Sequence, residues 1–299
     1  MIPEDILDLF RLPAGKKVKL KNHDPAWAGT DEMKELTKEE IKERAQTILN
    51  QSLAGLDEIQ NLLYADNRYS ILVVFQAMDA AGKDGTIKHV MSGVNPQGCQ
   101  VFSFKKPSDE EMEHNFLWRY MRCLPERGRI GIFNRSYYED VLIVKVHPEL
   151  LGSHLPRKKV GRKFWKHRYE DINAFERHLV RNGTVILKFF LHVSKGEQKK
   201  RFLQRLDRPE KHWKFSTADL AERKYWDEYM DAYEDALSAT STDWAPWYVV
   251  PADHKWVARA VVADILCSAI RGLDLKYPEV SEEKQNQLQE DRQRLMDEE

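Results

Sequence analysis

Asp79 and Lys83 are the residues of this chain whose types and spacing point most directly to chemistry. They lie in a segment of small and polar residues, 79–86, between an apolar β-branched run, 71–75, and a segment with helical character, 86–91. In a strand–turn–helix of this kind, backbone N–H groups and the helix dipole face an anion, and a lysine adds charge for the terminal phosphates. The pattern predicts a phosphate-binding loop formed by Asp79, Ala80, Ala81, Gly82, Lys83, Asp84, Gly85 and Thr86.

The loop departs from the standard G-x-x-x-x-G-K-[ST] pattern at Ala77 and Asp84. The hydroxyl that normally holds Mg²⁺ is therefore missing. A carboxylate at Asp79 is strongly repelled by phosphates unless a divalent cation lies between them. Asp79 is accordingly the candidate ligand for Mg²⁺, or for Mn²⁺ in its place. The alternative is an ordinary strand–turn–helix in which this Asp only caps the helix.

A second polar cluster, residues 134–140, follows a buried apolar run, 130–133. Open α/β sheets bind ligands at the carboxyl ends of their strands, so we expect this cluster beside the phosphate loop. Arg135 is the candidate for contacting the transferring phosphoryl group, and a surface salt bridge is the alternative. Glu139 or Asp140 is expected to approach the metal, although a position at a helix N-terminus explains these acids equally well.

Further cations are distributed over several segments that flank the expected site. Outside the loop, the candidates for binding phosphate or nucleotide are Lys105, Lys106, Arg119, Arg122, Asn134, Arg208, Lys211 and Lys214. Pro209 breaks a helix, and cations surround Trp213, which suggests a lid over about 205–225. The alternative is that Trp213 anchors a core and that the lysines are its solvated neighbours.

Strand and helix patterns alternate along the chain and predict an α/β protein. We expect a parallel sheet of five strands, right-handed crossovers, helices on both faces and a helical lid. The expected strands are 71–75, 99–104, 130–133, 184–193 and 246–251. Thr37 and Glu40 form a capping box that opens a long helix, and a later helix is expected over 218–237. We expect an N-terminal arm (1–36), one domain carrying loop and lid (37–273) and an acidic tail (274–299).

The composition excludes wholesale disorder, because 42% of the 299 residues are apolar. The net charge is only −1, so any polyanion must meet a local patch such as the basic run 157–168. Three widely spaced cysteines (Cys99, Cys123 and Cys267) show no metal or redox pattern, which favours the reducing cytoplasm. No apolar run is long enough to span a membrane, and no signal peptide is recognised.

Several motifs together resemble the polyphosphate kinase type 2 family over roughly residues 13–272. The segments that carry the resemblance are Gln76–Thr86, Asn95–Gly98, Phe133–Asp140 and Lys211–Ser216. The first is similar to the family's Walker A loop, although Ala77 stands where the family loop commonly has Gly. Ala at this position is expected to disfavour a positive φ in the loop, because Ala tolerates positive φ poorly.

The resemblance implies a thymidylate-kinase-like P-loop fold and Mg²⁺-dependent phosphoryl transfer between inorganic polyphosphate and nucleotides. It implies a metal and phosphate role for Asp79, a phosphate role for Lys83 and a transfer role for Arg135, with the lid closing over the site. Asn134 stands at the Walker B position, as in the subgroup that phosphorylates AMP as well as ADP. We also expect a homo-oligomer.

Two other functions compete with this expectation. An ATP-dependent nucleoside monophosphate kinase of the same fold needs an adenine pocket and a single triphosphate donor rather than cations spread over many segments. A non-enzymatic P-loop protein could instead bind RNA or DNA through its basic stretches. Retention of both Asp79 and Lys83 disfavours that alternative, and no known nucleic-acid-binding module is recognisable.

Overall fold

The computed structural model describes residues 2–33, 35–151 and 160–298, and the first part of the basic run 157–168 lies outside them. The strands form one parallel sheet in the order β2-β3-β1-β4-β5. Their bounds are β1 Ser70–Gln76, β2 Cys99–Ser103, β3 Ile130–Asn134, β4 Thr184–His192 and β5 Trp247–Pro251. The expected parallel five-stranded sheet is confirmed, and its carboxyl edge carries both predicted polar segments.

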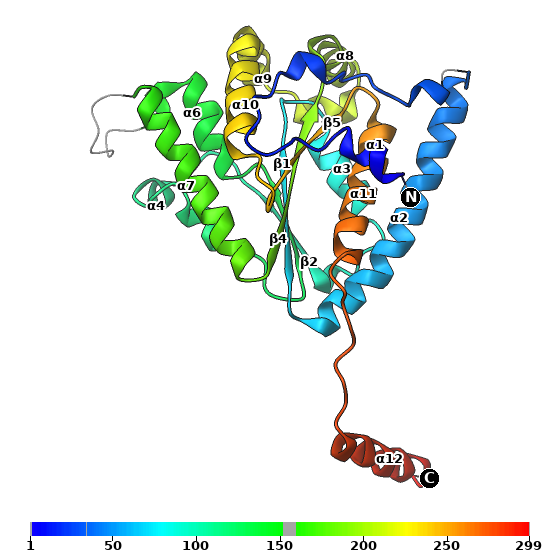
Figure 1. The fold of residues 1–299 in the computed structure, drawn as a ribbon. Helices are drawn as coiled ribbons and strands as arrows, with labels where there is room; N and C mark the ends of the chain where they lie inside the picture. The colour runs from blue at the N-terminus through cyan, green and yellow to red at the C-terminus, as the bar shows by residue number, and fades with distance from the viewer. Residues whose placement is uncertain (1, 34, 152–159, 299) are drawn as a thin grey trace.

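Helices cover both faces of this sheet (Figure 1). One group contains α2 (Lys38–Asp66), α3 (Lys83–Val90) and α11 (Lys255–Arg271). The other contains α6 (Ile143–Val146), α7 (Arg162–Arg181) and α10 (Trp226–Thr240). Two short helices, α4 (Asp109–Met112) and α5 (Trp118–Met121), connect β2 to β3. Strands β1, β3 and β4 are buried between these layers, which explains their largely apolar sequences, whereas β2 lies at the edge of the sheet and is mostly exposed.

Local capping signals fix the helix starts. The Thr37 hydroxyl accepts a hydrogen bond from Glu40 N at 3.3 Å, and the Glu40 carboxylate accepts one from Thr37 N at 2.7 Å. The predicted capping box is therefore confirmed at the start of α2. Ser194 caps α8 (Lys195–Leu206) in the same manner, by accepting a hydrogen bond from Glu197 N.

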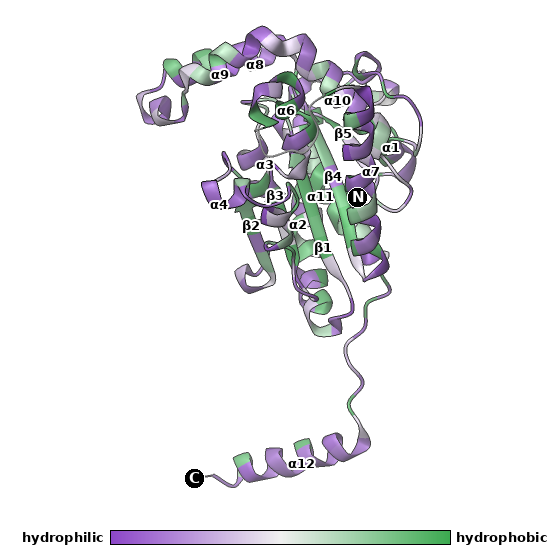
Figure 2. Cartoon of the chain, turned by 90° about the vertical axis from the view of Figure 1, so that its left-hand side faces the viewer, coloured by the Kyte–Doolittle hydropathy of each residue, from purple (hydrophilic) through white to green (hydrophobic). Residues whose placement is uncertain are grey.

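Helix α8 and helix α9 (Thr217–Glu222), joined by the 3₁₀ turn η6 (Pro209–Lys214), form an arm that projects from the body (Figure 2). We call residues 195–225 the lid arm. Trp213, at its tip, is 78% exposed, so the alternative that this side chain anchors a core is wrong.

The helix predicted over 218–237 is interrupted. It is replaced by α9, the 3₁₀ turn η7 (Arg223–Tyr225) and α10. Near the break, the Glu222 carboxylate accepts a hydrogen bond from the Tyr229 hydroxyl at 2.6 Å and contacts His147 Nε2 at 2.9 Å. These contacts and the turn redirect the chain from the lid arm into the domain, which periodicity alone did not reveal.

The two ends of the chain differ in how they pack. The N-terminal segment begins with α1 (Glu4–Asp8) and then lies along β5, where Leu12 N donates to Trp247 O at 2.8 Å. The C-terminal helix α12 (Glu282–Met296) has no buried residue and lies away from the body (Figure 1). The remaining 3₁₀ turns are η1 (Leu20–Asn22), η2 (Asp31–Met33), η3 (Pro96–Gly98), η4 (Tyr137–Val141) and η5 (Pro148–Leu151). Within the described ranges, no helix has the length and apolarity needed to cross a membrane.

Candidate active site

The phosphate loop connects β1 to α3, as the motif predicts. Gly82 adopts φ 112° at the N-cap of α3, and Ala80 adopts φ 60°. Ala77 is not among the described residues with positive φ, so its substitution for Gly does not strain the loop. The Lys83 ammonium donates to Ala77 O at 2.9 Å, and burial, followed by the charge of Arg135, lowers the pKa of Lys83. The loop thus points its lysine along the edge where an anion would bind.

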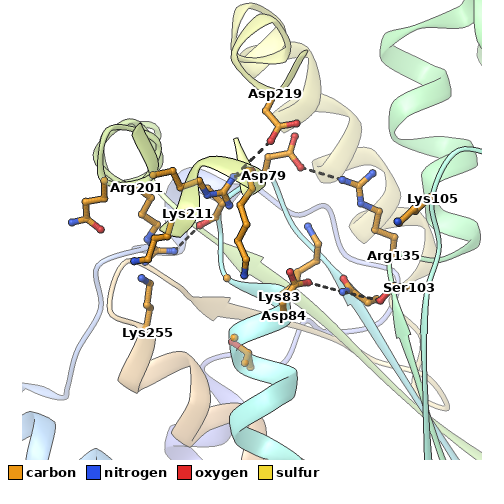
Figure 3. Close-up of a pocket in the computed structure, with 18 of the residues that line it drawn as sticks. Asp79, Lys83, Asp84, Ser103, Lys105, Arg135, Arg201, Lys211, Asp219 and Lys255 are labelled. Carbon is orange, nitrogen blue, oxygen red and sulfur yellow. Dashed lines mark hydrogen bonds and ion pairs between the residues drawn. The ribbon is translucent and has the colours of Figure 1, made fainter. Parts of the chain in front are cut away.

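A cavity of about 660 Å³ lies over this loop (Figure 3). We call it the phosphate cavity. Its lining includes every predicted loop residue except Ala81, which is buried. The predicted residues outside the loop that line it are Lys105, Lys106, Asn134, Arg135, Lys211 and Lys214. Four cations that we did not predict also line it, namely Arg201, Arg205, Lys255 and Arg259.

Arg135 faces Asp79 across this cavity, at 3.2 Å between Nη2 and the carboxylate. Glu139 lies 3.9 Å from the same guanidinium. Burial lowers the pKa of Arg135, but Glu139 and Asp79 more than offset this, so the pKa is raised and the charge is secure. The φ of Arg135 is 66°, an unusual backbone conformation for a residue with a side chain. Such conformations persist where the surroundings enforce them, often at functional sites.

A buried network holds the turn that follows Arg135. The hydroxyls of Tyr137 and Tyr138 both donate to Glu176 Oε1, at 2.9 and 2.8 Å. The other Glu176 oxygen accepts from Lys188 Nζ at 2.6 Å, and neither charged side chain is exposed. Because a buried charge without its partner is strongly destabilising, these contacts fix the turn and the direction of Arg135.

Asn134 bridges the loop to the neighbouring strands. Its amide donates to the Asp84 carboxylate at 2.8 Å and to the Ser103 hydroxyl at 3.4 Å. Asp84 occupies the position where the standard motif has Ser or Thr. A carboxylate at 134 would repel Asp84, whereas the amide pairs with it.

A second cavity of about 650 Å³ lies between α4–α5 and α6–α7. We call it the mixed cavity, because aromatic and aliphatic walls accompany both acids and cations. Arg119 and Arg168 line it with side chains that are 8% and 9% exposed. Within the described residues, Arg119 Nε and Arg168 Nη1 have no hydrogen-bond partner. Asp140 lies 3.5 Å from Arg168, and burial raises the pKa of Asp140 to about 6.

Three predicted positions differ from expectation. Arg122 follows the end of α5, is exposed, and places its guanidinium 4.7 Å from the Trp118 ring, away from both cavities. Arg208 is exposed where the chain turns into Pro209, so it too lies outside the phosphate cavity. Glu139 contacts Arg135 but does not line the cavity, which fits a counter-ion better than a metal ligand.

The cations that we missed had a detectable signal. Arg201 is on the helix directly after β4, and Lys255 and Arg259 are one turn apart on the helix directly after β5. Helices that follow parallel strands begin at the carboxyl edge of the sheet, where ligands bind. The same rule that located Arg135 therefore applies to these three residues.

The donor set around Asp79 suits Mg²⁺ or Mn²⁺. Mg²⁺ usually binds one or two protein carboxylates and fills its other positions with water and phosphate oxygens. Asp79 lines the cavity, and only one of its oxygens is paired with Arg135. The part of the chain that the structure describes contains no group of three or more His, Cys, Asp or Glu able to hold a metal. A sparse protein contribution of this kind fits a metal that arrives with phosphates.

Together, the parallel sheet, the phosphate loop and the opposing arginine define a P-loop phosphotransferase. Residues 37–278 match the family model described as polyphosphate kinase 2. The chain is 56% identical over 259 residues to an ADP-polyphosphate phosphotransferase of Rhodopseudomonas palustris, covering 86% of this chain and 90% of that protein. It is 47% identical over 235 residues to an AMP/ADP-polyphosphate phosphotransferase of Meiothermus ruber, covering 79% and 83%.

A crystal structure of polyphosphate kinase 2 from Arthrobacter aurescens matches with a TM-score of 0.81 and 41% identity, over 92% of each chain. The chain therefore belongs to the polyphosphate kinase 2 family. The predicted family and fold are confirmed, and the chain is an enzyme, a polyphosphate-dependent nucleotide phosphotransferase.

Proposed function

We propose that this enzyme transfers phosphoryl groups, with Mg²⁺, from inorganic polyphosphate to both AMP and ADP, reversibly. The observation that carries the proposal is the length of the cationic lining. Lys and Arg side chains extend from Lys105 and Lys106 after β2, across the loop, to Lys255 and Arg259 on α11. A single nucleoside triphosphate needs cations only around the loop, whereas a long polyanion uses the whole row.

The donor chain is proposed to lie on the side of Lys211, Lys214, Lys255 and Arg259. Burial lowers the pKa of Lys255, and the charges of Arg201 and Lys211 lower it further, so these cations repel one another. A bound polyanion relieves that repulsion. The loop N–H groups and Lys83 then hold the phosphates next to the transferring group.

The transferring group is proposed to lie between Lys83 and Arg135. Phosphoryl transfer requires alignment and neutralisation of charge more than covalent chemistry. Lys83 and Arg135 supply two fixed positive charges, and Glu139 keeps Arg135 oriented and protonated. Asp79 is proposed to hold Mg²⁺, or Mn²⁺, which neutralises phosphate oxygens when it is bound.

The phosphates of the acceptor nucleotide are proposed to bind Lys105 and Lys106, and the nucleoside of the same nucleotide is proposed to enter the mixed cavity. The two cavities adjoin at this segment, because Arg119 of the mixed cavity donates to Lys105 O at 2.9 Å. A nucleoside is neutral, has an apolar ring face and carries several hydrogen-bonding groups. Walls that combine Phe116 and Phe164 with Arg168 and Asp140 match those needs.

A comparison of donors tests the proposal against an ATP-dependent monophosphate kinase. The purified enzyme with Mg²⁺ and each of AMP, ADP, GMP and GDP is given either polyphosphate or ATP, and products are resolved by chromatography. We expect product with polyphosphate as the sole donor. Phosphorylation of the acceptor by ATP, with no product from polyphosphate, would establish the rival. Steeply salt-dependent binding of homopolymeric RNA without turnover would establish a polyanion-binding protein.

The cytoplasm and a homo-oligomer complete the proposal. The three cysteines are free thiols in the structure, which suits a reducing compartment. Light scattering on the purified enzyme measures the oligomeric state, and a monomer at all concentrations contradicts the homo-oligomer. Nucleic acid and membranes are not expected partners.

A further inference from the structure

The base of the lid arm is attached to the back of the phosphate loop. Two side chains of α8, Gln198 and Arg201, are 1% and 4% exposed. Gln198 Nε2 donates to Asp79 O at 2.9 Å. Arg201 Nη1 donates to Ala80 O at 3.1 Å and to Ala81 O at 2.6 Å. Three consecutive carbonyls of the loop, those of residues 79–81, are therefore held by the lid arm.

Arg201 is anchored at its other nitrogens as well. Nη2 donates to Ala252 O and Asp253 O, at 2.6 and 3.0 Å, in the segment between β5 and α11. Nε donates to Glu197 Oε1 at 2.9 Å. A planar guanidinium with a partner at every nitrogen is a rigid connector, which a lysine cannot replace. It holds the loop carbonyls of Ala80 and Ala81 in place and so supports the positive φ of Ala80.

The C-terminal end of the lid arm is also bonded to Gln198. Arg223, in η7, donates through Nη1 to Gln198 Oε1 and, at 3.3 Å, to Lys195 O. One amide therefore receives the far end of the arm on its oxygen and holds the Asp79 carbonyl with its nitrogen. Lys211 and Lys214 lie in η6, between α8 and α9. Both helices of the arm therefore connect that segment to Gln198, α8 directly and α9 through Arg223.

We propose that Gln198, Arg201 and Arg223 are positioning residues that couple the lid arm to the backbone of the phosphate loop. A polyphosphate chain long enough to reach Lys211 and Lys214 stabilises one position of the arm. Through Gln198 and Arg201, that position fixes the carbonyls of residues 79–81 and so aims the loop N–H groups at the transferring phosphate. Chain length then affects kcat as well as KM. This inference rests on the proposed donor and goes beyond it, because it assigns a coupling role to Gln198 and Arg223, which do not line the phosphate cavity, and a second role to Arg201, which does.

The test measures kcat and KM for ADP phosphorylation across a series of polyphosphate lengths, from short to long. In the parent enzyme, kcat should rise with length until the chain reaches the lid arm. In Arg223→Met, we expect kcat with long chains to fall about tenfold to the short-chain value, with kcat for short chains and KM for ADP unchanged. Gln198→Glu keeps the oxygen that receives Arg223 but loses the N–H to Asp79, and should behave like Arg223→Met. Arg223→Lys should restore part of the length dependence.

Lys224→Met is the matched control, since Lys224 is the exposed neighbour of Arg223 in η7. Thermal unfolding must show that each variant is folded. Three results overturn the proposal: a parent kcat independent of chain length, an equal loss of kcat for all lengths, or an effect on polyphosphate KM alone. No turnover with any polyphosphate would instead refute the proposed function, so the two failures are distinguishable.

Discussion

The two cavities of this enzyme have nearly the same volume, about 660 and 650 Å³, but opposite chemistry. The phosphate cavity is lined by ten Lys and Arg side chains and only three Asp. The mixed cavity has two Arg and two His against five Asp and Glu, together with apolar walls. A cavity with a large excess of cations selects phosphates, whereas a partly apolar cavity without that excess suits a nucleoside. Under the proposed function, this difference divides one substrate, a nucleotide, between two neighbouring cavities.

The largest effect is expected at the centre of the phosphate cavity. Asp79→Asn and Lys83→Ala should each lower kcat by at least about 100-fold, because the first removes the proposed Mg²⁺ ligand and the second removes a positive charge beside the transferring group. Asp79 lies in the loop between β1 and α3 and Lys83 begins α3, both outside the apolar core, so thermal unfolding should change little. Activity is measured at saturating Mg²⁺ with polyphosphate and ADP. If either variant keeps near-parental turnover, the reaction is not centred on this loop.

A smaller effect is expected at the lid arm. Replacing Lys211 and Lys214 together by Met should raise the KM for long polyphosphate about tenfold and flatten its salt dependence, because both cations contribute to capture of the polyanion. The matched control replaces Arg122 and Arg208 by Met, since these exposed cations lie outside the phosphate cavity. An unchanged KM at low salt, or an equal change in the control, would make the lysines ordinary solvated residues.

Substitutions in the mixed cavity should affect the nucleotide rather than polyphosphate. Arg168→Met should raise the KM for AMP and ADP about tenfold, because a hydrogen bond from a charged group to the nucleoside is lost. The KM for polyphosphate should not change. Arg177→Met is the control on the same helix, since the Arg177 guanidinium also stacks on an aromatic ring and lies 4.4 Å from the ring centroid of Trp244. A rise in polyphosphate KM alone would reverse the assignment of the two cavities.

The last effect concerns stability rather than activity and involves Asp140. Burial raises the pKa of this carboxyl from 3.8 to about 6 in the folded state. A folded-state pKa above the unfolded value means that the stabilisation is complete below about pH 4 and is lost as pH rises through 6. Asp140→Asn should remove this loss, which is at most about 3 kcal/mol, and flatten the unfolding free energy between pH 4 and 7. Urea unfolding at several pH values measures it, and parallel profiles for both proteins would contradict it.

Most residues of the phosphate cavity could be predicted from the sequence, but few of the residues around it could. The loop and Arg135 were predictable because each follows a buried strand within a few residues, so local pattern determines position. Strands β1, β3 and β4 were predictable from their largely apolar runs. Arg119 was assigned to nucleotide binding, and the structure places it in the mixed cavity, a surface that forms only when α4–α5 and α6–α7 pack.

Tertiary contacts explain what was missed. The position of Arg201 after β4 could have been predicted, but the hydrogen bonds of Gln198 and Arg201 to backbone carbonyls more than one hundred residues away could not, because no local pattern specifies them. Arg122 and Arg119 were treated alike, yet α5 ends between them and turns only Arg119 inward. The break at 222–226 depends on Glu222 and on Arg223 binding distant partners, so periodicity predicted one continuous helix.

The acceptor range tests most directly the central claim, that one phosphate loop transfers phosphoryl groups from polyphosphate to AMP and to ADP. The Asn134 amide pairs with Asp84 and adds no further carboxylate to the phosphate cavity. Under the proposed function, this neutral position would let the site accept the α-phosphate of AMP or the β-phosphate of ADP. The measurement incubates the enzyme with AMP, polyphosphate and Mg²⁺, without ADP or adenylate kinase. We predict that ADP and then ATP will form from AMP. If a parallel incubation with ADP yields ATP while the incubation with AMP yields no product, the claim is contradicted.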